Sequence, residues 1–194
     1  MLIVSYVLNK IKQNQLLFIS LIVVFLVGFL LGIFFDLPQL LSELYSSFVI
    51  DIFNNALFNK EPIFSFFFTR ILNLILLYLI SFLLCLNGIS FFGIFALIFY
   101  RAYVLAVAVK TCAISLKFLG IIPFIFTVFL ESFTVTFSLI IYAVLCYEYY
   151  EKRRDCFIEK HVKKTLICFI IGVLGIIVEC LFLICIFRPI NFYF

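Results

Sequence analysis

Three ionisable side chains lie deep inside long apolar stretches of this sequence: Arg101, Glu131 and Glu179. An Arg, Lys or Asp at the middle of a membrane helix costs about 2.5–3.5 kcal/mol, so such charges usually face a partner or a cavity. Two acids and one base therefore predict an intramembrane ion pair of Arg101 with Glu131 or Glu179. The alternatives are an ion, proton or solute pathway lined by these charges, and a contact with another membrane subunit.

Small and polar residues accompany the two acids at helical spacing. One helix face is predicted to carry Thr127, Glu131, Thr134 and Ser138, and a second face Thr165, Cys168, Gly172, Gly175 and Glu179. Close helix packing in lipid uses small and polar faces, so these two faces are expected to meet inside a bundle. Gly28 and Gly32 are further helix-packing candidates, because their G-x-x-x-G spacing suits a homodimer face or packing within the chain equally well.

The residue inventory gives little support for catalysis. His161 is the single histidine, and it lies among basic residues outside the predicted spans. The sequence contains no H-E-x-x-H, G-x-S-x-G or Walker pattern, and its seven cysteines form no C-x-x-C pair. The pair Glu131 and Glu179 lacks an adjacent base or metal ligand for acid–base catalysis. We therefore expect a protein that is not an enzyme, with no catalytic, cofactor-binding or metal-binding residues.

The elements that must position these charges are membrane spans. Apolar residues make up 67 % of the chain and charged residues 12 %, which indicates an all-α, polytopic transmembrane bundle. A soluble nucleic-acid binder is excluded, because almost no residues remain for a soluble surface. The 194 residues are expected to form a single integral membrane domain, residues 1–194, with about five spans over residues 16–35, 64–86, 89–109, 123–147 and 165–187.

Two stretches between these spans need a separate interpretation. Residues 36–63 repeat apolar side chains every four positions and lean acidic, which predicts an amphipathic, extracytoplasmic segment. The apolar stretch over residues 118–147 would be about 45 Å long as a helix, against a hydrocarbon core of about 30 Å. We therefore expect a short interfacial or re-entrant piece around residues 112–122, and a re-entrant or split segment at 111–147 would give six crossings.

The basic residues predict the orientation in the membrane. Six of the 14 Lys and Arg residues fall between Lys152 and Lys164, and Lys10 and Lys12 precede the first span. The positive-inside rule then makes the N-terminus and the loop at residues 148–164 cytoplasmic in a multi-pass protein of the cell membrane. A docking site for an anionic partner or for lipid headgroups is the alternative interpretation of the basic cluster.

In order and spacing, residues 16–187 resemble the stage II sporulation protein M family of endospore-forming bacteria. The first span has the family's two glycines, Gly28 and Gly32, and a long acidic segment follows it. The chain departs from the family at Ala102, where a glycine is usual, and at residues 130–132, where the family has Pro-Gln-Asn. Other similar stretches are residues 70–74 (RILNL), 87–89 (NGI), 100–105 (YRAYVL) and 116–121 (LKFLGI).

This resemblance implies a non-enzymatic membrane scaffold that acts in sporulation, during engulfment of the forespore. Such a scaffold recruits two extracytoplasmic peptidoglycan hydrolases, a lytic transglycosylase and an amidase. Segment 36–63 would be the contact for these partners, and a homo-oligomer is compatible with the sequence. The alternative from the residues alone is a small membrane transporter or permease subunit that uses its intramembrane charges.

Overall fold

A computed structural model describes residues 2–35, 63–86, 92–115, 129–152 and 157–187 of the chain. Within these ranges five helices are long and apolar enough to cross a membrane, so the expected all-α bundle of five spans is confirmed. The elements are α1 (Leu2–Gln13), α2 (Gln15–Phe34), α4 (Ile63–Leu86), α5 (Phe92–Ser115), α7 (Leu130–Lys152), α8 (Phe157–Phe182) and a π-helical extension of α8 (Leu183–Phe187).

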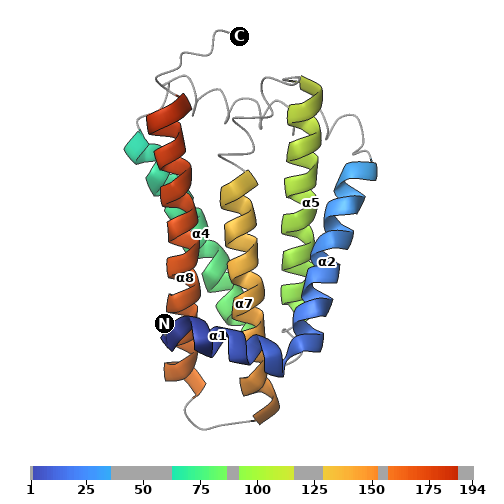
Figure 1. Ribbon diagram of the computed structural model, residues 1–194, viewed down its shortest axis with the longest axis vertical. Helices are drawn as coiled ribbons and strands as arrows, with labels where there is room; N and C mark the ends of the chain where they lie inside the picture. The colour runs from blue at the N-terminus through green and yellow to red at the C-terminus, as the bar shows by residue number, and fades with distance from the viewer. Residues whose placement is uncertain (1, 36–62, 87–91, 116–128, 153–156, 188–194) are drawn as a thin grey trace.

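The spans run alternately in opposite directions along one axis (Figure 1). The short helix α1 lies across one end of the bundle, where α2 begins and where α7 gives way to α8 (Figure 1). The ends of α2, α5 and α8 lie at the opposite end (Figure 1). An odd number of crossings therefore separates α1 from the end of α8.

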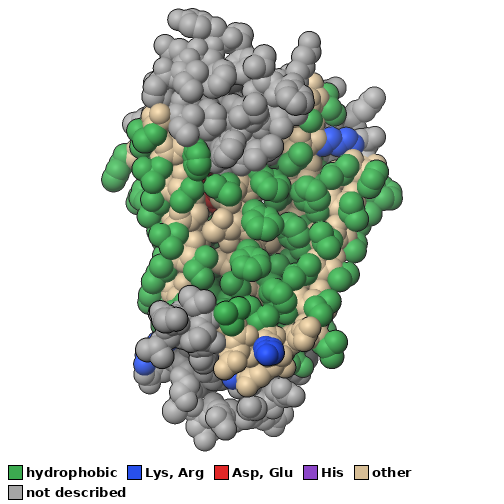
Figure 2. Space-filling model, viewed as in Figure 1, with side chains coloured by type: hydrophobic (Ala, Val, Ile, Leu, Met, Phe, Trp, Pro, Cys, Tyr) green, Lys and Arg blue, Asp and Glu red, His purple; other side chains and the backbone are tan. Residues whose placement is uncertain are grey.

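Helix α7 forms the centre of the bundle. It contacts α1, α2, α4, α5 and α8, and 67 % of its apolar stretch is buried, against 17–39 % for the other four spans. The outer spans instead direct large apolar side chains outwards, among them Leu30, Leu83 and Leu174. Figure 2 shows hydrophobic side chains covering the middle of one face of the bundle, with Lys and Arg near the ends of that face. Such a surface fits a bilayer, which confirms an integral, multi-pass membrane protein.

The glycines of α2 allow close packing of this helix on α5. A Cβ added at Gly28 would lie 2.7 Å from the carbonyl oxygen of Phe99, and one at Gly32 would lie 2.6 Å from that of Tyr103. These contacts are with backbone atoms, which cannot rotate away as a side chain can. The G-x-x-x-G face of α2 therefore packs within the chain, against α5. The small side chain of Ala102 on α5 also allows this close approach.

The structure differs from the sequence expectations in the positions of two helix ends and in the presence of helix α1. Helix α5 continues to Ser115, beyond the expected end at residue 109, and α8 begins at Phe157 rather than at residue 165. Apolarity ends at the edge of the hydrocarbon, but the hydrogen-bonded backbone continues as helix into the interface. Helix α1 was not expected, yet its Val7 and Ile11 pack against the core. Of the short piece expected around residues 112–122, residues 112–115 form the last turn of α5. Residues 116–122 and segment 36–62 lie outside the described residues.

Candidate functional site: a charge cluster inside the bundle

A salt bridge joins α4 to α8 inside the bundle. The Nη2 atom of Arg70 lies 3.2 Å from Oε1 of Glu179, within hydrogen-bonding distance. The Glu179 side chain is only 1 % exposed, whereas that of Arg70 is 22 % exposed. The Arg70 guanidinium also lies 5.1 Å from the ring centroid of Phe66, one turn earlier on α4. The arginine is therefore held by a carboxylate on one side and an aromatic face on the other.

Arg101 and Glu131 extend this salt bridge into a four-residue charge cluster, which comprises Arg70, Arg101, Glu131 and Glu179. Glu131 is buried and interacts electrostatically with both arginines and with Glu179. It stands in the first turn of α7, where the positive end of the helix dipole favours a carboxylate. The hydroxyl of Ser132 donates a hydrogen bond of 3.1 Å to its Oε2 atom. The members of the charge cluster come from four of the five spans, and their formal charges cancel.

The structure thus groups the three ionisable residues singled out from the sequence and adds Arg70. Glu179 pairs with Arg70 rather than with Arg101. Glu131 attracts Arg101 electrostatically, but the described residues show no salt bridge between these two side chains. Arg70 was not among the ion-pair candidates identified from the sequence. One signal in the sequence was available: Arg70 and Glu179 lie at similar depths from those ends of their helices that share one side of the bundle. Arg70 lies seven residues after Ile63, about 10 Å, and Glu179 lies eight residues before Phe187, about 12 Å.

The two small and polar faces meet as expected, but the face on α8 is shared between two neighbours. A Cβ at Gly175 would lie 3.0 Å from Cβ of Thr134 on α7. A Cβ at Gly172 would instead lie 3.0 Å from a methyl group of Leu74 on α4. The glycines therefore allow α8 to pack closely on both α7 and α4. Thr127 lies outside the described residues.

A buried hydroxyl network continues from the charge cluster towards the α1 end of the bundle. The Tyr78 hydroxyl of α4 donates a 2.9 Å hydrogen bond to the carbonyl oxygen of Cys168 on α8, and it also bonds the Ser138 hydroxyl of α7. Further along, Thr165 donates to the Tyr142 hydroxyl at 3.2 Å. These bonds connect α4, α7 and α8 through groups that lipid could not satisfy.

One buried lysine lies near the α1 end. The Nζ atom of Lys164 donates a 2.7 Å hydrogen bond to the carbonyl oxygen of Leu145, and the lysine is 5 % exposed. This lysine belongs to the basic cluster that the sequence placed in the cytoplasmic loop. The structure uses it to fasten α8 to α7 rather than to present charge at the surface.

The remaining chemistry-bearing side chains form no reactive constellation in the part of the chain that the structure describes. Cys85, Cys146, Cys168 and Cys180 are buried thiols, Cys185 is an exposed one, and none of these five is in a disulfide. No group of three or more His, Cys, Asp or Glu side chains lies together among the described residues. The side chain of His161 is outside the described set.

Comparison with known proteins gives no match for this chain among protein-family models, curated proteins or solved structures.

Proposed function

We propose that the protein is a non-enzymatic membrane scaffold that recruits peptidoglycan hydrolases, similar to the stage II sporulation protein M family. The observation that carries this proposal is the charge cluster of Arg70, Arg101, Glu131 and Glu179. Its members come from α4, α5, α7 and α8, and their formal charges cancel. A salt bridge between α4 and α8, with two further opposite charges nearby, favours a rigid platform over an open passage for a solute.

The distribution of basic residues supports an extracytoplasmic docking face. Helix α1 carries Lys10 and Lys12, and it lies at the end of the bundle where α7 ends and α8 begins (Figure 1). The sequence from residue 152 to residue 164 includes six basic residues. The positive-inside rule favours the cytoplasm for this end. The acidic segment 36–62 begins and ends at the opposite end, after α2 and before α4. In this proposal that segment contacts a lytic transglycosylase and an amidase outside the cell.

Co-purification from native membranes tests the recruitment. An affinity-tagged chain is crosslinked in its native membrane, purified in detergent, and the eluate is assayed for peptidoglycan-degrading activity on a zymogram. The matched control replaces residues 36–62 by a Gly/Ser linker of equal length and is required to reach the membrane in equal amount. We expect hydrolase bands with the natural chain and at least a tenfold loss with the control. Equal activity with both proteins, or capture of an ATPase subunit without any hydrolase, would overturn the proposal.

A second candidate function, a small ion-coupled transporter subunit, is favoured by one specific observation. The Oε2 atom of Glu179 is buried and has no hydrogen-bond partner among the described residues. It lies in the same charge cluster as Glu131, at the start of α7, which begins well below the upper ends of α5 and α8 (Figure 1). Proton uptake into proteoliposomes that enclose a pH-sensitive dye separates the two functions. A transporter should lose uptake when Glu179 is replaced by Gln, and a scaffold should show no uptake with either protein.

A further inference from the structure

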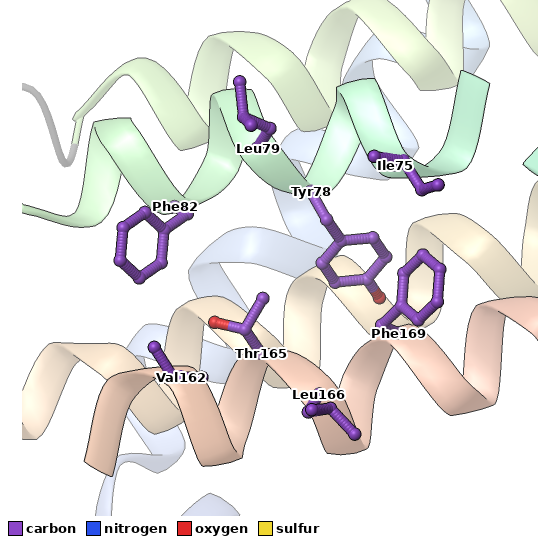
Figure 3. A pocket seen from close by; sticks show the side chains of 8 residues that line it. All are labelled: Ile75, Tyr78, Leu79, Phe82, Val162, Thr165, Leu166 and Phe169. Atoms are coloured by element: carbon purple, nitrogen blue, oxygen red, sulfur yellow. The ribbon is translucent and has the colours of Figure 1, made fainter. Parts of the chain in front are cut away.

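An apolar groove of about 280 Å³ runs between α4 and α8 on the outside of the bundle. Figure 3 shows its walls facing one another from the two helices. The groove lies in the half of each span nearer to the α1 end, because α4 ends and α8 begins at that end (Figure 1). Its apolar walls include Ile75, Leu79 and Phe82 of α4, and Val162, Leu166 and Phe169 of α8.

The polar groups at the floor of this groove are already used inside the bundle. The hydroxyl of Tyr78 donates to the Cys168 carbonyl oxygen, and that of Thr165 donates to the Tyr142 hydroxyl. Figure 3 shows the Tyr78 ring extending from α4 towards α8, with its oxygen at the end away from α4. An occupant therefore meets hydrocarbon and ring faces, which suits an alkyl chain better than a polar ligand.

Positive charge marks the end of the groove where a headgroup would lie. Val162 lines the groove and is followed by Lys163, which is exposed. Residues 152–164 contain six basic residues in the sequence; Lys164 is bonded inside the bundle, and Lys163 is the one of the six that the described residues show exposed at this end. A basic cluster at the cytoplasmic end of a site between two spans is the arrangement that attracts anionic lipid headgroups.

We propose that this groove binds one acyl chain of an anionic phospholipid, with the phosphate held at the Lys163 end. The lipid would fill a surface that α4 and α8 leave open to the bilayer, and it would fix the crossing of these two spans. The site is independent of hydrolase recruitment, because it lies at the other end of the bundle.

The natural chain contains no Trp, so a single introduced Trp reports on lipid in the groove without background. The probe is Phe82→Trp, purified and reconstituted in vesicles that contain brominated phosphatidylglycerol or brominated phosphatidylcholine, whose bromines quench nearby Trp fluorescence. The matched control is Ile80→Trp, which lies on the same helix, about 3 Å along the axis and about 200° around it. Ile80 is exposed but does not line the groove.

We expect the Phe82→Trp probe to be half-quenched at about a fivefold lower fraction of brominated phosphatidylglycerol than of brominated phosphatidylcholine, since one lysine near the surface gives about this preference. The Ile80→Trp control should show no preference. Adding Lys163→Gln to the Phe82→Trp chain should reduce its preference several-fold. Equal quenching of Phe82→Trp by both lipids would overturn the headgroup assignment. Quenching of the control without quenching of the probe would show that protein, such as a second copy of the chain, fills the groove.

Discussion

Replacing Arg70 should destabilise the bundle more than replacing Glu179, although either substitution breaks the salt bridge between them. The substitution Arg70→Met would leave the Glu179 carboxylate, 1 % exposed, without its partner. Removing one member of a buried ion pair costs about 3–5 kcal/mol. The substitution Glu179→Gln should cost about half as much. Arg70 is 22 % exposed, keeps its contact with the Phe66 ring, and still interacts with Glu131.

Thermal unfolding in detergent can be followed with a dye that fluoresces when it reacts with thiols, because four described cysteines are buried. At about 2–4 °C per kcal/mol for a chain of this size, Arg70→Met should lower Tm on the order of 10 °C. The double variant Arg70→Met/Glu179→Gln should lose less than the sum of the single variants, since neither charge then remains unpaired. Lys12→Met, at an exposed position on α1, is the control and should change stability by less than about 0.5 kcal/mol. Strictly additive losses in the double variant would refute the assigned pairing.

Three further predictions concern packing, hydrogen bonding and orientation. Gly32→Ala should destabilise the bundle by about 1–3 kcal/mol, because the new methyl group meets backbone; Gly93→Ala, whose new methyl group meets a leucine side chain, should cost less in the same thermal assay. Tyr78→Phe should cost about 1–3 kcal/mol, because it leaves buried partners of the hydroxyl unsatisfied, and an unchanged Tm would contradict the hydroxyl network. Cysteines introduced at Gln13 and Ile114 should be labelled by an impermeant maleimide from opposite sides of the membrane. In right-side-out vesicles we expect the Ile114→Cys variant to react and the Gln13→Cys variant to be protected, and the reverse pattern would invert the orientation.

The sequence alone was sufficient to predict the five spans, because long uncharged stretches have few other stable placements. Helix ends were less predictable. The third span was expected to end at residue 109, yet α5 continues through Lys110 and Thr111 to Ser115. Hydropathy locates the edge of the hydrocarbon, whereas a helix ends where its backbone hydrogen bonds end. Residues near that edge can therefore be polar and helical at once.

Charge pairing was predictable in kind but not in detail. The sequence shows that buried charges need partners, but the choice between Arg70 and Arg101 for Glu179 depends on which spans are neighbours. That choice follows from the central position of α7 and from the packing of α8 against α4 through Gly172 and Leu74. Neighbour relations among spans are tertiary facts, and five similar apolar stretches contain little information about them. The glycine pair of α2 illustrates this, since its spacing identified a packing face and left open which helix packs there.

The central helix also has a consequence for how the chain enters the membrane. Helix α7 is the least apolar of the five candidate spans, and it carries Glu131 in its first turn. On its own, α7 should insert inefficiently, because the translocation machinery releases segments into lipid according to their apolarity. Earlier spans that remain next to the translocation machinery would pack against α7 and enter the lipid together with it. Helix α5, which carries Arg101, is the main candidate. Membrane insertion of this protein would then be cooperative, and a chain that lacks α5 would lose the crossing of α7 as well.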